Sequence, residues 1–213
     1  MSGGLISVRE EWSFSELLAA GWNEADLEWE RLSEEALSCL ADDRADEARS
    51  NFAAALRLAR DAFKSGDPRL AASLSNQAAA VASVDGHAKA AQIRAVAVQA
   101  WAGCDGWVEK MTAPRTARSS LFHLRMERLH RPAYEERWRV KGRELLAGVR
   151  AEIGSADTLE LVGPQEAASR LARWHRERPV TLSDPRKLMA AVILLGAREK
   201  LAEPQEHEAG AVR

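Results

Sequence analysis

Cysteine, tyrosine and long apolar runs are scarce in this sequence of 213 residues, and each scarcity excludes a class of protein. The two cysteines, Cys39 and Cys104, lie far apart with no CxxC motif, which fits a reducing compartment where free cysteine packs as a small apolar side chain. The longest apolar run, 188–197, is about half of what a transmembrane helix needs. Charge interrupts the N-terminal residues before any signal-peptide core. We therefore predict a soluble, cytoplasmic protein with no membrane partner.

Sequence motifs for catalysis are also lacking. The chain contains no P-loop, no GxGxxG, no GxSxG and no HExxH motif. A chain of 213 residues that consists of helical repeats leaves no room for an appended catalytic domain. The sequence therefore predicts a protein that is not an enzyme and that needs no cofactor.

What the sequence has in abundance is alanine and arginine. Alanine contributes 40 residues, and 24 arginines stand against only 6 lysines. Strong helix formers dominate, while valine, isoleucine, threonine and tyrosine are sparse. This composition predicts an all-helical chain.

Charge is distributed unevenly although the formal net charge is only −2. Residues 1–63 carry 14 acidic and 6 basic side chains, a balance of −8, whereas residues 110–150 carry 11 basic and 4 acidic, a balance of +7. Such asymmetry is typical of an acidic partner for the basic segment, of self-association, or of two solvated helix faces. Composition does not decide among these three.

Capping residues mark most of the helix boundaries. Asn23 with Asp26 predicts a helix start, and Asp67 followed by Pro68 predicts an N-cap with proline at the first helical position. Gly66 and Gly86 predict helix ends. The expected helices cover residues 13–21, 24–41, 45–64, 68–84 and 87–102.

Residues 29–104 contain an internal repeat. Residues 29–62 aligned with 71–104, a shift of 42, share seven identical positions. Their spacing places apolar and small residues on facing stripes of two antiparallel helices, and small residues let such helices approach closely. The identities are Leu32/Leu74, Ser33/Ser75, Ala36/Ala78, Asp43/Asp85, Ala48/Ala90, Ala53/Ala95 and Ala55/Ala97.

The repeat resembles a known family. Residues 29–62 look like a tetratricopeptide repeat, because Leu32, Ala36, Cys39, Ala48, Phe52 and Ala55 fall at that family's signature positions. Residues 67–100 look like the 42-residue variety of kinesin-light-chain-like tetratricopeptide proteins, and DPRLAASLSNQAAAV (67–81) is the most specific similarity. The second repeat departs from the family pattern at Arg94, where the first repeat has the aromatic Phe52. A generic alanine-rich helical bundle is the alternative.

We therefore expect an all-α fold, an α-solenoid of about three antiparallel helix pairs with a C-terminal helical cap. The third pair should comprise residues 115–130 and a helix that starts at Pro132, and an apolar helix at 185–202 should provide the cap. The predicted units are a short N-terminal helix (1–28), two repeats (29–102), a divergent third pair (103–153), the cap (154–202) and a disordered tail (203–213).

The resemblance implies a partner-binding groove on the inner helices. Asn76 occupies the position where the resembling family often uses asparagine to bond the backbone of a bound peptide, and an amide both donates and accepts hydrogen bonds. A structural role for Asn76 within the helix stack is the alternative. The other residues expected to face this groove are Ser33, Leu37, Leu40, Ser75, Ala79 and Ser83.

Two further clusters lie in the basic segment. Arg118, Arg125 and Arg128 share one helix face and suit the carboxylates of an acidic peptide, unless they are solvated arginines paired with nearby glutamates. Nucleic acid is a poor fit, because no stacking aromatics are interleaved with these arginines. His123, Glu127 and His130 share another face, but a di-iron site needs a second ExxH copy and two further carboxylate helices, so we predict no metal.

The sequence thus predicts a protein-binding adaptor, assembly factor or regulatory subunit that holds a peptide or subunit in a helical-repeat groove. A structural homo-oligomer joined through residues 185–202 is the first alternative, and a metal-dependent helical enzyme is the second.

Overall fold

The structure is a computed structural model that describes residues 22–110, 121–156, 158–176 and 195–196. For residues 121–129, 173–176 and 195–196 it describes the backbone alone. The expected N-terminal helix at 13–21 and the tail at 203–213 lie outside the described residues.

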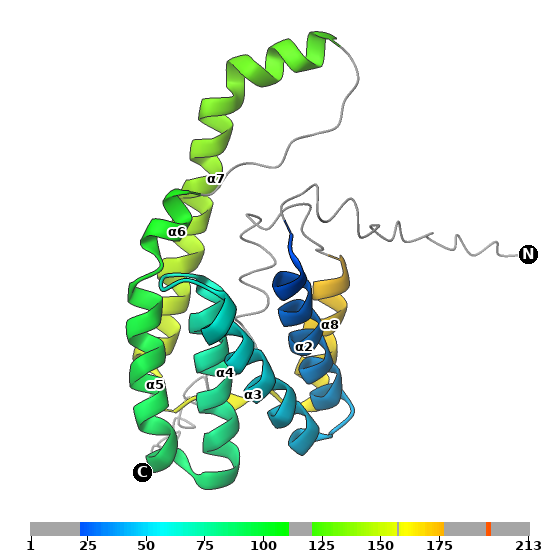
Figure 1. The fold of residues 1–213 in the computed structure, drawn as a ribbon, viewed down its shortest axis with the longest axis vertical. Coiled ribbons are helices and arrows are strands. Elements are labelled where there is room, and N and C mark those ends of the chain that lie inside the picture. The colour runs from blue at the N-terminus through cyan, green and yellow to red at the C-terminus, as the bar shows by residue number, and fades with distance from the viewer. Residues whose placement is uncertain (1–21, 111–120, 157, 177–194, 197–213) are drawn as a thin grey trace, which may run out of the picture.

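Helices dominate the described chain, as the composition predicts (Figure 1). The elements are α2 (Glu24–Ala41), α3 (Ala45–Ala62), α4 (Pro68–Asp85), α5 (His87–Ala102), α6 (Asp105–Glu109), α7 (Leu121–Ser155), β1 (Glu160–Leu161), α8 (Pro164–Arg176) and β2 (Leu195–Gly196). No helix in this part of the chain is long and apolar enough to span a bilayer.

Local capping signals set the starts of α2 and α4 as expected. The side chain of Asn23 accepts a hydrogen bond from the Asp26 amide at 3.0 Å, and the Asp26 carboxylate accepts one from the Asn23 amide at 2.7 Å. This reciprocal pair is a capping box. Asp67 caps α4 through the amide of Arg69 at 2.9 Å, with Pro68 in the first turn.

Helix α4 lies at the centre of the stack. Helices α2 to α5 each pack on the next in chain order, and β1 also lies against α4 (Figure 1). Five alanines of α4 are fully buried, and their small side chains let neighbouring backbones approach on several sides: Ala71, Ala72, Ala78, Ala79 and Ala80.

Two buried tryptophans connect α4 to the helices on either side of it. The indole of Trp29 on α2 donates to the Ser73 hydroxyl at 2.9 Å, and the indole of Trp101 on α5 donates to the Ser75 hydroxyl at 3.0 Å. Each serine in turn donates to a carbonyl one turn earlier in α4. Both indole N–H groups are thereby satisfied in the core, and α4 is held in register with α2 and α5.

The structure corrects the expected helix pair around Pro132. A single helix, α7, runs through this residue, so the predicted break does not occur. Proline removes one backbone donor and crowds the preceding turn, an effect that bends a helix as often as it ends one. Figure 1 shows α7 changing direction in its N-terminal part, before it runs alongside α5.

Reciprocal arginines hold α5 and α7 together. Arg150 of α7 donates to the carbonyl of Trp101 at 2.8 and 2.9 Å and to that of Ala102 at 2.9 Å, both at the end of α5. Arg94 of α5 donates to the carbonyl of Ile153 at 3.1 Å near the end of α7. These carbonyls lie at helix ends, where the negative end of the helix dipole favours a cation, and that of Trp101 also accepts from the Cys104 amide at 3.2 Å. Arg94 stands where the first repeat has Phe52, and its hydrogen bond to α7 accounts for this difference.

The segment after α7 folds back over the first helices. Strand β1 lies against α4, and α8 packs against α2. Leu159 and Val162, on either side of β1, are buried in the same apolar cluster as Leu37 and Ala79. The short strand β1 is followed by α8, which begins at Pro164 within the range expected to form the cap.

The expected helix at 185–202 is wrong at Leu195 and Gly196. These residues form β2, which pairs antiparallel with β1 in the register Glu160 to Gly196 and Leu161 to Leu195. The rest of 185–202 lies outside the described residues. An apolar run suits a buried strand as well as a buried helix, and backbone pairing with β1 selects the strand here.

We expect Arg150→Ala to lower the free energy of unfolding by about 1–3 kcal/mol, because three hydrogen bonds to α5 carbonyls are lost. Arg139→Ala on the same helix is the control, since its ion pair with Glu136 is on the surface and should contribute less than about 1 kcal/mol. Urea unfolding followed by circular dichroism measures both. Equal losses in the two variants would contradict the anchoring role of Arg150.

Candidate functional site

The residues expected to line the groove come together but are mostly buried. Ser33, Leu37 and Leu40 on α2 are at most 5% exposed. Ser75, Asn76 and Ala79 on α4 are at most 3% exposed. Ser83 alone is exposed, and its hydroxyl donates to the Ala80 carbonyl at 2.8 Å. In this structure these side chains therefore do not line an open groove, and their role in partner binding stays a prediction.

Residues that follow α7 contribute to the burial of this face. Strand β1 lies on α4 while α8 covers α2, so residues 158–176 occupy the face that a partner was expected to use. Burial of apolar side chains such as Leu159 and Val162 favours this arrangement. His87 lies 3.9 Å from the Glu160 carboxylate and adds a polar contact between β1 and the start of α5.

Asn76 stands out within this covered face. Its side chain is 3% exposed, and its amide oxygen has no hydrogen-bond partner among the described residues. A buried acceptor without a donor costs about 1–3 kcal/mol of stability. The neighbouring Ser75 differs, since it accepts from Trp101 and donates within α4. The described fold provides no hydrogen bond for the amide oxygen at position 76, so this oxygen does not stabilise the fold.

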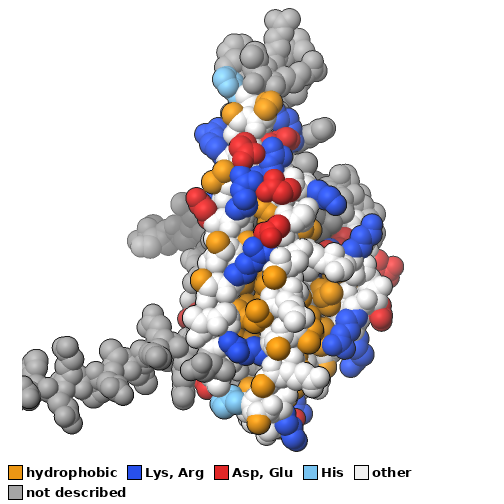
Figure 2. Space-filling model, turned by 90° about the vertical axis from the view of Figure 1, so that its left-hand side faces the viewer, with side chains coloured by type: hydrophobic (Ala, Val, Ile, Leu, Met, Phe, Trp, Pro, Cys, Tyr) orange, Lys and Arg blue, Asp and Glu red, His pale blue; other side chains and the backbone are white. Residues whose placement is uncertain are grey.

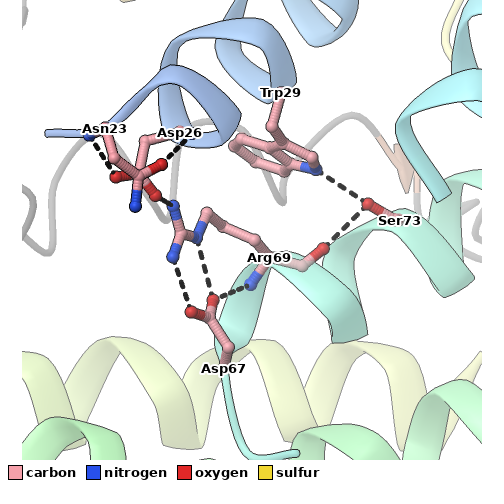
Figure 3. Close-up of polar contacts among 6 residues, drawn as sticks. All are labelled: Asn23, Asp26, Trp29, Asp67, Arg69 and Ser73. Carbon is pink, nitrogen blue, oxygen red and sulfur yellow. Dashed lines mark hydrogen bonds and ion pairs between the residues drawn. The ribbon is translucent and has the colours of Figure 1, made fainter. Parts of the chain in front are cut away.

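A buried ion-pair cluster joins the N-terminal turns of α2 and α4 (Figure 3). The guanidinium of Arg69 binds both oxygens of Asp67, at 3.0 Å from Nε and 2.7 Å from Nη2, and its Nη1 also binds Asp26. Burial disfavours the charge of Arg69, but its hydrogen bonds to Asp67 and Asp26 outweigh this and raise its pKa. The cluster is internally paired, so its chemistry is structural rather than catalytic.

Aromatic rings complete this cluster. The Arg69 guanidinium lies 3.6 Å from the centroid of the Phe63 ring, and Trp29 meets the same ring edge-on at 6.4 Å. Phe63, Asp67 and Arg69 form part of the wall of a cavity of about 480 Å³, together with Trp107. Sequence reasoning found Asp26 and Asp67 as caps but missed Arg69, because only the fold brings the two caps together.

The basic and metal-binding candidates are described only in part. Arg118 lies outside the described residues, and for Arg125 and Arg128 the structure gives only their backbone positions in α7. The same holds for His123 and Glu127, whereas His130 is exposed. Among the described residues, no group of three histidine, cysteine or acidic side chains could hold a metal ion.

Both cysteines are buried and free, as the sequence predicts. Burial raises the pKa of the Cys39 thiol. Burial also raises the pKa of the Cys104 thiol to about 12, although Arg150 opposes the shift. Both thiols therefore stay protonated and unreactive near neutral pH, because the thiolate is the nucleophilic form.

We expect Arg69→Ala to lower the free energy of unfolding by about 3–5 kcal/mol, because it leaves two largely buried carboxylates unpaired. Arg31→Ala is the matched control. Its pairs with Glu28 and Glu35 are on the surface, so the loss should be much smaller than for Arg69→Ala. Thermal and urea unfolding of both proteins measure the difference. A loss of only 1 kcal/mol or less for Arg69→Ala would contradict the buried cluster.

We expect Cys39 and Cys104 to react with a thiol reagent such as Ellman's only after unfolding. The ordinary pKa of a thiol is about 8.5. Between this pH and about pH 12, Cys104 therefore keeps its proton in the folded chain but loses it in the unfolded chain. Its contribution to stability is complete below about pH 8.5 and declines as the pH rises toward about 12. Fast labelling of native protein at pH 8 would contradict this.

Comparison with known proteins gives no family for this chain. No protein-family model matches it. No curated protein and no solved structure is significantly similar to it either. The function is therefore inferred from the residues and geometry of the chain itself.

Proposed function

We propose that this protein is a non-catalytic adaptor of the tetratricopeptide-like solenoid class, in which stacked helix pairs hold an extended segment of a partner protein. The pairs are α2 with α3 and α4 with α5. The bound segment would lie on the face formed by α2 and α4. Preorganised helices suit this task, because little conformational entropy is lost from the receptor on binding.

The core of the stack supports this proposal. The six residues at tetratricopeptide signature positions are all at most 7% exposed: Leu32, Ala36, Cys39, Ala48, Phe52 and Ala55. Their counterparts Leu74, Ala78, Ala90 and Ala97 in the second pair are equally buried. Both pairs thus use the same small-residue packing that the resemblance implies.

The observation that carries the proposal is the extended stretch of chain on α4. Residues 158–162 cross the helix that carries Asn76. An asparagine amide can both donate to and accept from a peptide backbone, and its oxygen is unpaired here among the described residues. We infer that the inner face, whose helix α4 already contacts the extended residues of β1, offers the unused acceptor of Asn76 to a bound segment.

A partner segment must then compete with the chain's own residues. Leu159 and Val162 supply the buried apolar side chains of the internal segment, so a competing peptide needs apolar side chains at a similar spacing. Competition with a tethered segment weakens the apparent affinity, because the internal segment is present at a high effective concentration. Weakening the internal segment should therefore strengthen binding of an external one.

We expect Leu159→Ala to tighten binding of a fluorescein-labelled peptide with the sequence of residues 155–163 by about tenfold relative to the unaltered chain. Fluorescence anisotropy measures the dissociation constants on the full chain, and circular dichroism confirms that the variant is folded. Leu146→Ala is the matched control, since this leucine is 2% exposed against 3% for Leu159 but lies on α7. It should leave the affinity unchanged.

Two outcomes would contradict the proposal. One is an absence of peptide binding to the folded Leu159→Ala protein, and the other is equal tightening in the Leu146→Ala control. A folded Leu159→Ala chain that also carries Asn76→Leu should lose the gain, because the amide is proposed to bond the peptide backbone.

We also expect Asn76→Leu alone to leave the free energy of unfolding unchanged or to raise it by about 1 kcal/mol, because it removes a buried acceptor without a donor. Ser75→Ala, one residue earlier, should lower it by about 1–3 kcal/mol by leaving the Trp101 indole unpaired. Urea unfolding compares the two. A large loss for Asn76→Leu would assign Asn76 to the fold and remove it from the binding site.

A further inference from the structure

Helix α7 has two different faces over residues 134–143, where it passes α6. On one face the charges are paired locally. Arg143 binds Glu109 of α6 at 2.6 Å and also Glu136, and Arg139 binds Glu136 at 3.1 Å. Figure 2 shows acidic and basic side chains side by side along this upper part of the molecule. This face is therefore electrically balanced.

The opposite face, which we call the α7 face, comprises Tyr134, Arg137, Trp138 and Lys141. The spacing of three, four and seven residues places them together on the helix. Tyr134 is 39% exposed, its ring centroid lies 6.3 Å from that of Trp138, and the Arg137 guanidinium lies 5.8 Å from the Tyr134 centroid. Arg137 and Lys141 have no carboxylate partner among the described residues. The exposed ring thus lies one helical turn before Arg137 and two turns before Lys141 on the same face.

A complementary surface lies on α2 and α3. A groove of about 510 Å³ is walled by the apolar side chains of Ala25, Leu27 and Leu58. Glu24 and Glu28 line the same groove and place carboxylates beside the apolar wall, with Arg31 paired to Glu28 at 2.8 Å. We call this the α2–α3 groove. Its volume admits an aromatic side chain, and its carboxylates oppose the charge of the α7 face.

We propose that the α7 face of one molecule docks into the α2–α3 groove of a second copy of this chain. Tyr134 enters the apolar groove, while Arg137 and Lys141 meet Glu24 and Glu28. Tyrosine, tryptophan and arginine are the residues that most often dominate protein interfaces. The balance of −8 over residues 1–63 and +7 over residues 110–150 steers the two regions toward each other between molecules.

The contact joins two different surfaces, so it is head-to-tail. Each molecule keeps one free α7 face and one free groove, and association continues into rings or open chains. An isologous dimer would need the same surface on both partners. This inference is independent of the proposed peptide-binding face on α2 and α4, because neither surface includes Asn76 or β1.

Sedimentation velocity of the full chain tests the contact. From about 5 to about 500 µM in about 50 mM salt, the average mass should rise beyond that of the monomer. The variant Arg137→Gln/Lys141→Gln and the variant Glu24→Gln/Glu28→Gln should each raise the dissociation constant about tenfold, because the two exposed ion pairs are lost. Arg139→Gln/Arg143→Gln removes the same charge from the balanced face and should leave association unchanged.

Mixing the α7-face variant with the groove variant gives the sharpest outcome. One intact contact remains per pair, so the mixture should form dimers and nothing larger. A monomer at every concentration would overturn the proposal. So would equal disruption by the Arg139→Gln/Arg143→Gln control, which indicates general charge effects, or association that survives both variants, which indicates another surface.

Discussion

Close packing around α4 is the constraint on which the rest of the structure depends. Alanines at five buried positions bring α3 and α5 against this helix, and β1 lies on it as well. Side chains with larger volume would separate these backbones and would break the two tryptophan–serine hydrogen bonds that connect α4 to α2 and α5. Because alanine loses no side-chain entropy on burial, such a helix also costs little to order.

Arginine joins the elements that alanine brings close. Arg69 links the starts of α2 and α4, while Arg94 and Arg150 bind carbonyls at the ends of α7 and α5. Each makes several hydrogen bonds and reaches at least one group from another part of the chain, a geometry for which the planar guanidinium fork is better suited than a lysine ammonium. The excess of arginine over lysine, which composition left without an explanation, has a structural use in these three contacts.

The face formed by α2 and α4 combines stability with a proposed function. Its own C-terminal segment covers it and buries Leu159 and Val162, which stabilises the fold. The buried amide oxygen of Asn76 on α4 has no hydrogen-bond partner among the described residues, a feature that lowers stability. Polar groups that destabilise the unbound fold are typical of binding sites. The same face therefore stabilises the fold by burying the internal segment, and an external segment must displace that internal segment to bind.

The sequence by itself determined the helical class, the boundaries of α2 to α5 and the buried positions of the repeat. These depend on capping residues and on apolar spacing within one helix, such as Asn23 with Asp26, which are local. Only the tertiary structure decided that α7 continues through Pro132, that Leu195 pairs with β1, and that β1 lies on α4 while α8 packs on α2. Each depends on contacts between residues far apart in the chain, and no local signal encodes which distant segment will supply the partner.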